Sequence, residues 1–466
     1  MKQVDIVDFP YRLDAERLFG AVRDLPDAIW LDSGKPRSLY GRFDIITAQP
    51  DTVLETVGHT TRIITSHTTH ASEEDPFSLA EQLLASTGPV DKCYNSHPFV
   101  GGLAGYFGYD LGRTIEVLPH TLSKVDNLPD MRVGNYSWAL VLNHLAQKAW
   151  LFFRHNCPDS LRKDITRRLK QANDRVIDDS AIDDSVVNHS LTDGSFSPSI
   201  SKNDYLKTIA RVKQYISEGD CYQANIAQHF SAPFSGDNWA LYRSLRRVLP
   251  SPYSCFYQWG DKNQAVLSLS PERFLKLSMG QVEAKPIKGT SRRGNTVDED
   301  QINAIALMNS PKNRAENLMI VDLLRNDLGK TFEPGSIRVP KMFALESFPN
   351  VHHLVSTVTG KLRSNESALS LLRGCFPGGS ITGAPKKRAM EIIEELEVCR
   401  RSVYCGSIGY ISATGRMDTN IAIRTLIADG EKLHCWGGGG IVADSIAESE
   451  YQETLDKVSV LLGTLE

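Results

Sequence analysis

The chain of 466 residues has no basic tract and no sustained apolar run. Its N-terminal stretch, MKQVDIVDFPYRLDAERLF, carries several acids, so we recognise neither a secretory signal nor a membrane anchor there. The formal net charge of −4 disfavours general binding to nucleic acid. We therefore expect a cytoplasmic protein whose partners include neither nucleic acid nor a membrane.

Paired cysteine motifs are absent as well. The eight cysteines show no C-x-x-C spacing, which disfavours a zinc site and a disulfide framework. We interpret them as reduced thiols that pack as small apolar side chains. The hydrophobic fraction of 41% is ordinary for a globular protein, and the length is sufficient for a large core.

A polar, acidic stretch divides the chain. Residues 176–200 are rich in aspartate and serine, and we assign them to a loop or linker. Residues 1–175 form an N-terminal region of short alternating strands. Within it, Phe99 to Asp110 reads FVGGLAGYFGYD, a composition typical of strands whose backbones approach closely. Residues 201–466 form a second region.

Capping residues predict several helices in the second region. Ser201 precedes an apolar pattern of helical spacing, and Ser310 with Pro311 begins a helix that continues to Leu328. Another helix is expected from about residue 298 to 308. The segment Ser380 to Glu397 starts a helix at Pro385 after a glycine-rich approach, and its free backbone donors would form an anion cradle.

Alternating patterns predict strands between these helices. Residues 265–287 resemble a β-meander, with Glu272 of SPERF between the first two strands. Further strands are expected at residues 403–412, 417–428 and 432–436. The glycine run that follows them is expected to lead into a C-terminal helix from about Ser445.

One lysine stands at a conformationally restricted position. The segment Ala284 to Thr290 reads AKPIKGT, and its proline and glycine predict a strand that ends at a constrained turn. A lysine held there, Lys288, is a candidate nucleophile if burial or neighbouring cations lower its pKa. Taken alone, a solvated surface charge is the better interpretation.

The C-terminal helix carries two stripes. Its apolar stripe consists of Tyr451, Leu455, Val458 and Leu462. Glu450, Glu453 and Lys457 fall about 140° away by helical geometry. Two interpretations remain open, a solvated face with an ion pair or a pair of carboxylates that bind Mg²⁺, and periodicity alone favours the first.

Seven motifs in order change this balance. They are SPERF (270–274), PIKGT (286–290), ENLMIVDLLRNDL (316–328), SFPNVHHLVSTV (347–358), FPGGSITGAPKKRAMEIIEELE (376–397), MDTNIAIRTL (417–426) and GGGGIVADS (437–445). Together they resemble the chorismate-utilising enzymes, which include anthranilate, isochorismate, salicylate and aminodeoxychorismate synthases. The resemblance implies an α+β fold, a two-sheet antiparallel β-sandwich surrounded by helices, with both regions interwoven into one body and residues 201–466 binding chorismate.

The resemblance also implies roles for individual residues. The implied Mg²⁺ ligands are Glu316, Glu450 and Glu453. The implied substrate-binding residues are Thr382, Lys386, Tyr404, Arg424, Gly438, Gly439, Gly440 and Lys457. His353 matches a histidine in the floor of the family's active site, and Glu272 matches its general acid.

Lys288 indicates which branch of the family is closest. Anthranilate synthases typically have PIAGT where this chain has PIKGT, a form that resembles the aminodeoxychorismate synthases. The implied reaction is a Mg²⁺-dependent amination of chorismate at C4, of the aminotransferase class and in the 4-aminobenzoate branch of folate biosynthesis. Lys288 would add covalently to C2 while Glu272 protonates the departing C4 hydroxyl.

Ammonia for this reaction requires a source. A glutamine amidotransferase would show a cysteine in a G-x-C-x-G-x-Q elbow, which no cysteine of the chain occupies. A separate glutaminase subunit is therefore the implied partner. The alternatives are an anthranilate synthase component and, from another class, a non-catalytic tryptophan-binding regulator. The complete set of implied catalytic residues argues against the regulator.

The N-terminal region offers a second binding site. Residues 30–43 match the place where anthranilate synthases carry a tryptophan pocket. The corresponding residues are Leu31, Ser33, Tyr40, Arg42 and Phe43. Asp32 departs from the family's LLES pattern, and the two interpretations are a structurally bound L-tryptophan and an empty core.

Overall fold

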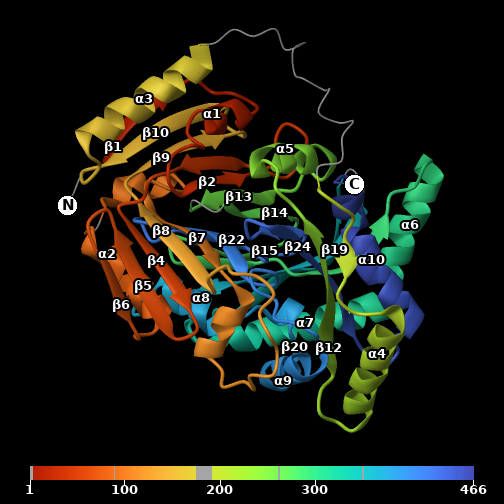
Figure 1. Ribbon diagram of the computed structural model, residues 1–466. Coiled ribbons are helices and arrows are strands. Elements are labelled where there is room, and N and C mark those ends of the chain that lie inside the picture. The colour runs from red at the N-terminus through yellow and green to blue at the C-terminus, as the bar shows by residue number, and fades with distance from the viewer. Residues whose placement is uncertain (1–3, 89, 175–191, 261–262, 349–350, 466) are drawn as a thin grey trace.

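The computed structural model describes residues 4–88, 90–174, 192–260, 263–348 and 351–465, which form two twelve-stranded antiparallel sheets with helices around them (Figure 1). The expected α+β sandwich is confirmed. Most of the predicted loop at residues 176–200 lies outside the described residues. Both sheets combine strands from before and after this loop, so the two regions share their sheets.

The strands of the first sheet are, in spatial order, β1 (Val4–Phe9), β10 (Lys148–Arg154), β9 (Trp138–Asn143), β3 (Phe43–Thr47), β2 (Ala28–Asp32), β13 (Tyr253–Trp259), β14 (Gln264–Ser270), β23 (Thr425–Ala428), β24 (Lys432–Ile441), β12 (Gln223–Pro233) and β11 (Ser197–Pro198), with β20 (Gly383–Ala384) beside β12. Those of the second sheet are β17 (Ile287–Arg292), β19 (Val351–Lys361), β16 (Gln281–Ala284), β15 (Arg273–Ser278), β22 (Met417–Asn420), β21 (Ser407–Ser412), β7 (Gly102–Phe107), β8 (Met131–Tyr136), β4 (Thr52–Val57), β5 (Thr60–Thr65) and β6 (Thr69–Ser72), with β18 (Arg338–Ser347) beside β19.

The helices cover the outer surfaces of the two sheets. They are α1 (Glu16–Gly20), α2 (Pro76–Ser86), α3 (Asp159–Asp174), α4 (Lys202–Ser217), α5 (Asn238–Val248), α6 (Val297–Asn309), α7 (Pro311–Gly329), α8 (Ala368–Cys375), α9 (Lys386–Leu396) and α10 (Ala447–Gly463), with short 3₁₀ turns η1 (Lys92–Ser96), η2 (Tyr109–Thr114) and η5 (Gly379–Ile381). None of the described helices is both long and apolar enough to span a membrane.

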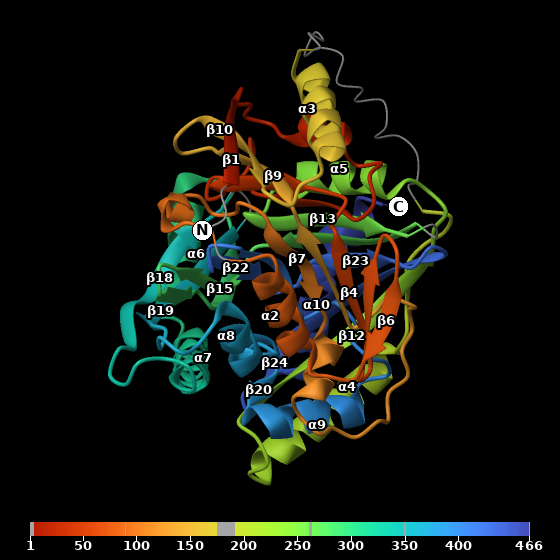
Figure 2. The same cartoon turned by 90° about the vertical axis from the view of Figure 1, so that its left-hand side faces the viewer.

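The apolar core has three parts. The largest lies between the two sheets and extends to α2 and α7, which pack on the second sheet, and to α8 beside them. A second lies where α1, α3 and α5 pack on the first sheet, at the top of Figure 1. The third joins α4 and α9 to β12, and Figure 2 shows these two helices together at the lower end of the molecule. Six of the eight cysteines are buried free thiols, as expected.

The prediction of a β-meander at residues 265–287 is wrong in one respect. β14 lies in the first sheet and β15 in the second, so the chain changes sheets between Ser270 and Arg273. The single strand expected at residues 417–428 is likewise two strands, β22 in the second sheet and β23 in the first. Arg424, with a φ of 50°, stands at this change. Side-chain alternation does not reveal such a crossing, because it continues on both sides of it.

Two further expectations at the C-terminal end need correction. The run Gly437 to Gly440 continues β24, where it pairs with β12, and the strand expected from residue 403 begins only at Ser407. The side chains of α10 that are buried are Glu450, Thr454, Val458 and Leu461, so the predicted apolar stripe is rotated toward Glu450. The carboxylate of this residue has internal polar partners, which hydrophobic periodicity does not register.

The predicted helix starts are confirmed. The Ser201 side chain accepts a hydrogen bond from the backbone of Asp204 at the start of α4, and Ser310 does the same for Asn313 at the start of α7. Pro311 occupies the first turn of α7 as expected. Pro385 immediately precedes α9. Each of these signals acts within the first turn of its own helix, so it can be recognised in the sequence.

The glycine-rich run at residues 99–110 forms β7, whose six residues are all buried. Gly105 has a φ of 150°, and a Cβ atom placed on it would lie 2.1 Å from the carbonyl oxygen of Arg132 in β8. No side chain fits between these backbones. The prediction of close strand packing is therefore confirmed.

We expect Gly105→Ala to lower the free energy of unfolding by about 3 kcal/mol or more, because the new methyl group must displace a neighbouring backbone. Gly58→Ala is the matched control. Gly58 has a φ of 59°, but its chain neighbours aside, no atom of the described residues would lie within 4 Å of a Cβ atom placed on it. Its cost should be about 1 kcal/mol, from backbone conformation alone. Chemical denaturation of both variants checks this, and equal losses would contradict the packing argument.

Candidate active site

The two changes of sheet lie side by side. β14 pairs with β23 in the first sheet, and β15 pairs with β22 in the second. Between the sheets, the backbone N–H of Ile421 donates to the carbonyl oxygen of Glu272 (3.0 Å), and that of Leu269 donates to the carbonyl oxygen of Arg424 (3.0 Å). The crossing thus brings the acid Glu272 and the base Arg424, which are 152 positions apart in the sequence, into one part of the molecule.

Glu272 is a buried acid with few partners. Its side chain is 5% exposed. Oε1 accepts a hydrogen bond from the Ser380 hydroxyl (3.0 Å) and a longer one from the Ile287 amide (3.5 Å). Burial raises the pKa of Glu272 to about 7, although the nearby Lys288 opposes this effect. A carboxyl group with such a pKa can donate a proton near neutral pH.

Lys288 lies on β17, not at a turn after a strand as predicted. The pairing of β17 with β19 is irregular between Ile287 and Thr290, and Gly289 there has a φ of 94°. The Lys288 Nζ donates to the carbonyl oxygen of Ser380 (3.1 Å). Burial lowers the pKa of Lys288, and the charge of Lys457 lowers it further, against the opposing effects of Glu316 and Glu272.

Three glutamates, Glu316, Glu450 and Glu453, come together from α7 and α10. Their electrostatic effects on one another show that they share one region. The Lys312 ammonium lies 3.1 Å from Glu450 Oε1 and 4.0 Å from Glu316 Oε1. Glu453 pairs with Lys457 at 2.6 Å. Burial and the neighbouring glutamates raise the pKa of Glu316, although two lysines oppose them.

These glutamates suit a hard cation by chemistry. Glu316 Oε1 is buried and has no hydrogen-bond donor within the part of the chain that the structure describes. A Cβ atom placed on Gly439 would lie 3.4 Å from Glu450 Oε2 and 3.8 Å from Glu453 Oε1, so the glycine leaves open space beside both carboxylates. As they stand, the described residues include no group of three ligand side chains gathered closely enough to hold a metal ion. The Lys312 ammonium supplies the positive charge there instead.

Arg424 is a half-buried cation between the two sheets. Among the described residues, its guanidinium has neither a hydrogen-bond acceptor nor an ion-pair partner, and burial lowers its pKa. Burial and the Arg424 charge lower the pKa of His353 to about 3, so this imidazole is neutral. Its Nδ1 is 2.9 Å from the Thr290 hydroxyl, and its buried Nε2 has no hydrogen-bond partner among the residues that the structure describes. An anionic ligand would satisfy the guanidinium.

An aromatic stack and a glycine strand border the same region. The Tyr404 ring stacks on Trp436 at 6.1 Å between centroids. The next residues of β24 are Gly437 to Gly440, which β23 does not cover, because its pairing with β24 ends at Cys435. Lys457 donates to the carbonyl oxygen of Gly438 (2.8 Å). The backbone edge of these glycines is therefore available to a ligand.

Two predicted substrate-binding residues have internal partners instead. Thr382 is fully buried, and its hydroxyl donates to the carbonyl oxygen of Gly378 (3.0 Å). Lys386 pairs with Asp327 of α7 at 2.6 Å and donates to the carbonyl oxygen of Cys375. These contacts hold the approach to α9 and its first turn to their neighbours, and substrate binding by these two residues stays a prediction.

Ser380 and Lys312 are site residues that sequence reasoning missed. Ser380 contacts both Glu272 and Lys288, yet the sequence marks it only as the first residue of a helix approach. The spacing of Lys312 and Glu316 would have indicated a helical ion pair. Nothing in the sequence indicates that Lys312 also reaches Glu450 of α10.

Comparisons with known proteins identify the family of this chain. A family model described as chorismate binding enzyme matches residues 26–463. Aminodeoxychorismate synthase component 1 of Klebsiella aerogenes is 45% identical over 462 residues, 99% of each chain. Anthranilate synthase component 1 of Pseudomonas aeruginosa is 35% identical over 93% of this chain and 89% of its own. The crystal structure of anthranilate synthase component I from Streptococcus pneumoniae aligns with a TM-score of 0.79 at 31% identity, covering 91% of this chain and 93% of that chain.

The chain belongs to the chorismate-binding enzymes. The match extends across the predicted loop at residues 176–200, in line with the shared sheets. The half-buried Arg424 and the open strand edge beside Gly439 lie within the matched region.

A second cavity, with a volume of about 100 Å³, lies between residues 31–45 and segments of the second region at residues 252–273 and 408–420. Of the residues predicted to bind tryptophan, Leu31, Tyr40, Arg42 and Phe43 line it. Ser33 does not; its backbone N–H donates to Asp44 (2.6 Å). Asp32, the departure from the family pattern, also lines the cavity.

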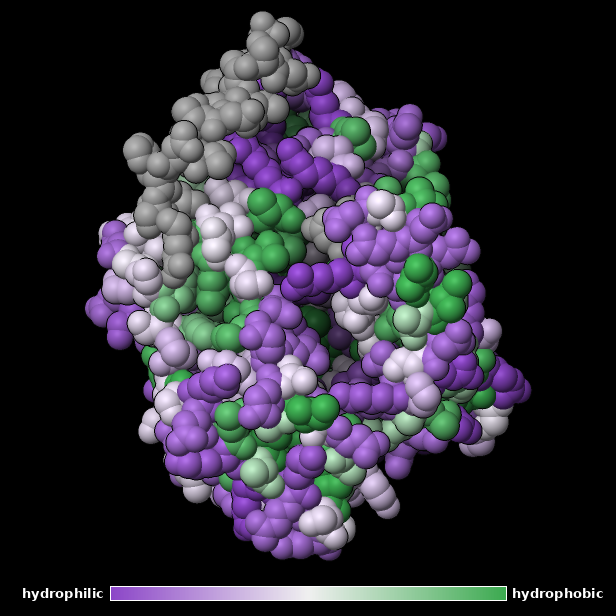
Figure 3. Space-filling view, turned by 90° about the vertical axis from the view of Figure 1, so that its right-hand side faces the viewer, coloured by the Kyte–Doolittle hydropathy of each residue, from purple (hydrophilic) through white to green (hydrophobic). Residues whose placement is uncertain are grey.

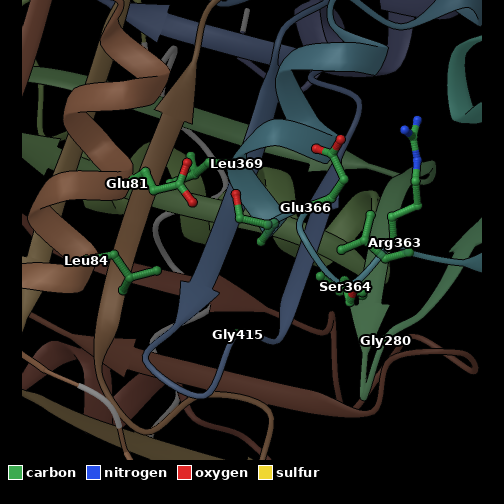
Figure 4. Close-up of a pocket in the computed structure, with 12 residues that line it drawn as sticks. Glu81, Leu84, Gly280, Arg363, Ser364, Glu366, Leu369 and Gly415 are labelled. Atoms are coloured by element: carbon green, nitrogen blue, oxygen red, sulfur yellow. The ribbon is translucent and has the colours of Figure 1, made fainter. Parts of the chain in front are cut away.

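A larger cavity of about 330 Å³ is separate from all of these residues. It lies between α2, the segment before α8 and the turns at Gly280 and Gly415 (Figure 4). Glu81 and Glu366 border it, and no predicted site residue lines it. Cavity size alone therefore does not locate the active site.

Figure 3 shows the face that carries α4, α6 and α10, which is hollowed near its middle.

We expect Gly439→Ala to fold normally but to bind chorismate at least tenfold more weakly. The added methyl group makes only ordinary contacts of 3.4 Å or more, yet it fills the space beside Glu450 and Glu453. Titration calorimetry measures the affinity, and thermal unfolding checks the fold.

Gly437→Ala is the contrasting variant, because a Cβ there would lie 2.6 Å from the carbonyl oxygen of Thr454. It should lose stability. Normal chorismate affinity in Gly439→Ala would show that this space is not used.

Proposed function

We propose that this chain aminates chorismate at C4 with ammonia and releases 4-amino-4-deoxychorismate, the precursor of 4-aminobenzoate in folate biosynthesis. The observation that carries the proposal is the pair formed by Lys288 and Glu272 around Ser380. A relative 45% identical over the full length is named for this synthase, which adds support. By reaction class, the chain would be an aminotransferase.

The environment of Lys288 supports the role of nucleophile. An amine attacks only as the free base, and burial next to the Lys457 charge lowers the pKa of Lys288 toward that form. Its hydrogen bond to the Ser380 carbonyl oxygen uses one N–H and leaves the nitrogen lone pair available. Anthranilate synthases typically have alanine at this position, so the lysine distinguishes the two chemistries.

The first step displaces the C4 hydroxyl group. The Lys288 nitrogen bonds to C2, the ring double bonds shift, and the C4–O bond breaks while Glu272 donates a proton, so that water leaves. The pKa of Glu272, about 7, keeps the proton available for this transfer. In the second step ammonia bonds to C4 and the C2–N bond to Lys288 breaks. A proton returns from the new ammonium group to Glu272, which restores both residues.

Binding and orientation fall to the surrounding residues. Arg424 and the neutral His353 would hold one substrate carboxylate, and Tyr404 with the glycine edge of β24 would border the ring. Glu316, Glu450 and Glu453 would hold Mg²⁺, and Lys312 would have to move away from them. When bound, Mg²⁺ would neutralise and orient a substrate carboxylate.

A separate glutamine amidotransferase subunit is the proposed source of ammonia. The relatives named component 1 support the existence of a second component. The cysteines of this chain do not suit glutaminase chemistry. Cys375, in GCFPGG, is buried, and this raises its pKa to about 12, so the thiolate nucleophile is not accessible.

We also propose L-tryptophan as a structural ligand of the 100 Å³ cavity. Leu31 and Phe43 offer apolar contacts, and Arg42 offers a positive charge for an amino acid's carboxylate. The buried Asp32 carboxylate is already paired with Arg246 at 2.6 Å. Burial raises the pKa of Asp32 to about 6, although the Arg246 charge opposes this. Ser33 is left out of this version of the site, because it does not line the cavity.

With chorismate, Mg²⁺ and ammonium, the wild-type chain should form 4-amino-4-deoxychorismate, and Lys288→Ala should lose at least 10³-fold in turnover because no covalent intermediate can form. Mass spectrometry identifies the product, and peptide mapping of quenched wild-type reactions should find a substrate-derived adduct on Lys288.

Lys285→Ala serves as the control, since the Lys285 ammonium is already paired with Glu346 at 2.5 Å on a neighbouring strand. Its turnover should stay within about twofold of wild type. Formation of anthranilate and pyruvate would assign the chain to the other branch. Unchanged turnover in Lys288→Ala would exclude the covalent step.

Calorimetry should detect binding of L-tryptophan to the chain, and Arg42→Ala should weaken it by about tenfold through loss of the carboxylate contact. Catalytic turnover of the same variant should remain near the wild-type value, because the cavity is separate from Lys288. Absence of binding in a wild-type sample that was unfolded and refolded without tryptophan would remove this ligand.

A further inference from the structure

Ser380 contacts both reacting side chains. Its hydroxyl donates to Glu272 Oε1 (3.0 Å), and its carbonyl oxygen accepts from Lys288 Nζ (3.1 Å). The same carbonyl accepts a second hydrogen bond from the Asn225 side chain (2.9 Å), which Gln223 holds in turn (2.8 Å). Ser380 therefore stands at the centre of a hydrogen-bonded group that joins η5, β12 and β17.

The backbone of Ser380 is seated closely between two elements. It follows Gly378 and Gly379 in the motif PGGS. A Cβ atom on Gly378 would lie 2.8 Å from the Ile421 side chain at the strand crossing, and one on Gly379 would lie 2.5 Å from Leu323 of α7. The absence of side chains at both positions lets η5 pack against the crossing, which determines where Ser380 points.

The hydrogen bonds determine which oxygen of Glu272 can carry a proton. Oε1 accepts from the Ser380 hydroxyl and faces the Ile287 amide, and both of these groups are donors. A proton on Oε1 would oppose them. Oε2 has no hydrogen-bond partner among the described residues. It is also not fully shielded from solvent. The acidic proton therefore belongs on Oε2.

We propose that Ser380 is a positioning residue for the amination: its hydroxyl directs the acidic proton of Glu272 to Oε2, and its carbonyl oxygen anchors the amine of Lys288. This inference rests on the proposed function. Donation to the carboxylate also favours the charged form of Glu272, so the hydroxyl keeps the acid from holding its proton too tightly. The other groups that influence Glu272 electrostatically are Lys288, Lys457 and Cys405.

The test compares wild type with Ser380→Ala, which removes the hydroxyl but keeps the carbonyl oxygen. Turnover is measured across neutral pH with total ammonium adjusted so that free ammonia stays constant. In wild type, activity should fall as pH rises through about 7, where Glu272 loses its proton. In Ser380→Ala this decline should move to higher pH, and kcat should drop on the order of tenfold while KM for chorismate stays within about twofold.

The direction of the shift separates positioning from general loosening. A loosened site would admit water and move the decline to lower pH, and an unchanged or lowered decline would overturn the proposal. Ser380→Thr, which keeps a hydroxyl, should restore the wild-type profile. If Ser380→Ala does not fold, Ser380→Cys, with its weaker donor, should shift the profile in the same direction.

A double-variant cycle gives a second readout. Because Ser380 acts through Glu272, adding Ser380→Ala to Glu272→Gln should change kcat by no more than about twofold. A full tenfold loss in both backgrounds would overturn the proposal. Ser407→Ala is the matched control, because Ser407 is fully buried and its hydroxyl donates to the backbone of Asn420 (2.7 Å) outside this group.

Failure of the proposed function would look different. If wild type forms no product aminated at C4, the assigned reaction is wrong, whatever the Ser380 variants do. If wild type forms that product and Ser380→Ala leaves the pH profile unchanged, only the role of Ser380 is wrong.

Discussion

The paired crossing of strands between the two sheets is the constraint on which the site depends. A single strand that left its sheet there would expose unpaired backbone groups in the interior, which is costly. Here β14 and β23 leave the first sheet together, and β15 and β22 continue as a pair in the second. Between the two pairs, the carbonyl oxygens of Glu272 and Arg424 accept backbone hydrogen bonds, so these groups are not left unpaired. Glu272 and Arg424 thus stand where neither sheet has a regular strand.

The charges around this crossing are incompletely matched. Among the described residues, the half-buried Arg424 has no anion, and Glu316 keeps one buried oxygen without a hydrogen-bond donor. Buried charges of this kind destabilise a protein unless something pairs with them. A dianionic substrate and a divalent cation would supply the missing charges together. The mismatch in the free chain therefore favours the ligand set that the family resemblance implies, and Lys312 compensates for only part of it.

Local signals in the sequence predicted the helices well, whereas the crossings needed the tertiary structure. The caps at Ser201 and Ser310 act within one turn, so the sequence shows them directly. The meander and the strand at residues 417–428 each look continuous in the sequence, because alternation does not change when a strand moves between sheets. The glycine strand of β24 lacks side chains, so it carries no periodic signal at all.

The site residues divide in the same way. Family motifs indicated Glu272, Lys288 and the glutamates, although hydrophobic periodicity favoured a solvated position for Glu450. The roles of Lys312 and Ser380 depend on contacts between distant segments, which no single stretch of sequence contains. Thr382 lies in the same motif as Ser380, yet its hydroxyl is used to hold the backbone of the helix approach. Membership of a motif therefore identifies a region more securely than it assigns each side chain.

The pair formed by Lys288 and Glu272 has two states with the same number of protons. One is an ion pair of ammonium and carboxylate, and the other is a neutral amine with a protonated acid, which is the reactive form. Burial is the largest influence on both groups, and it favours the neutral form of each. Mutual attraction and the Ser380 hydroxyl favour the ion pair. Because these effects oppose each other within one hydrogen-bonded group, the pair can pass between the two states by moving one proton, without any change in the protein's net protonation.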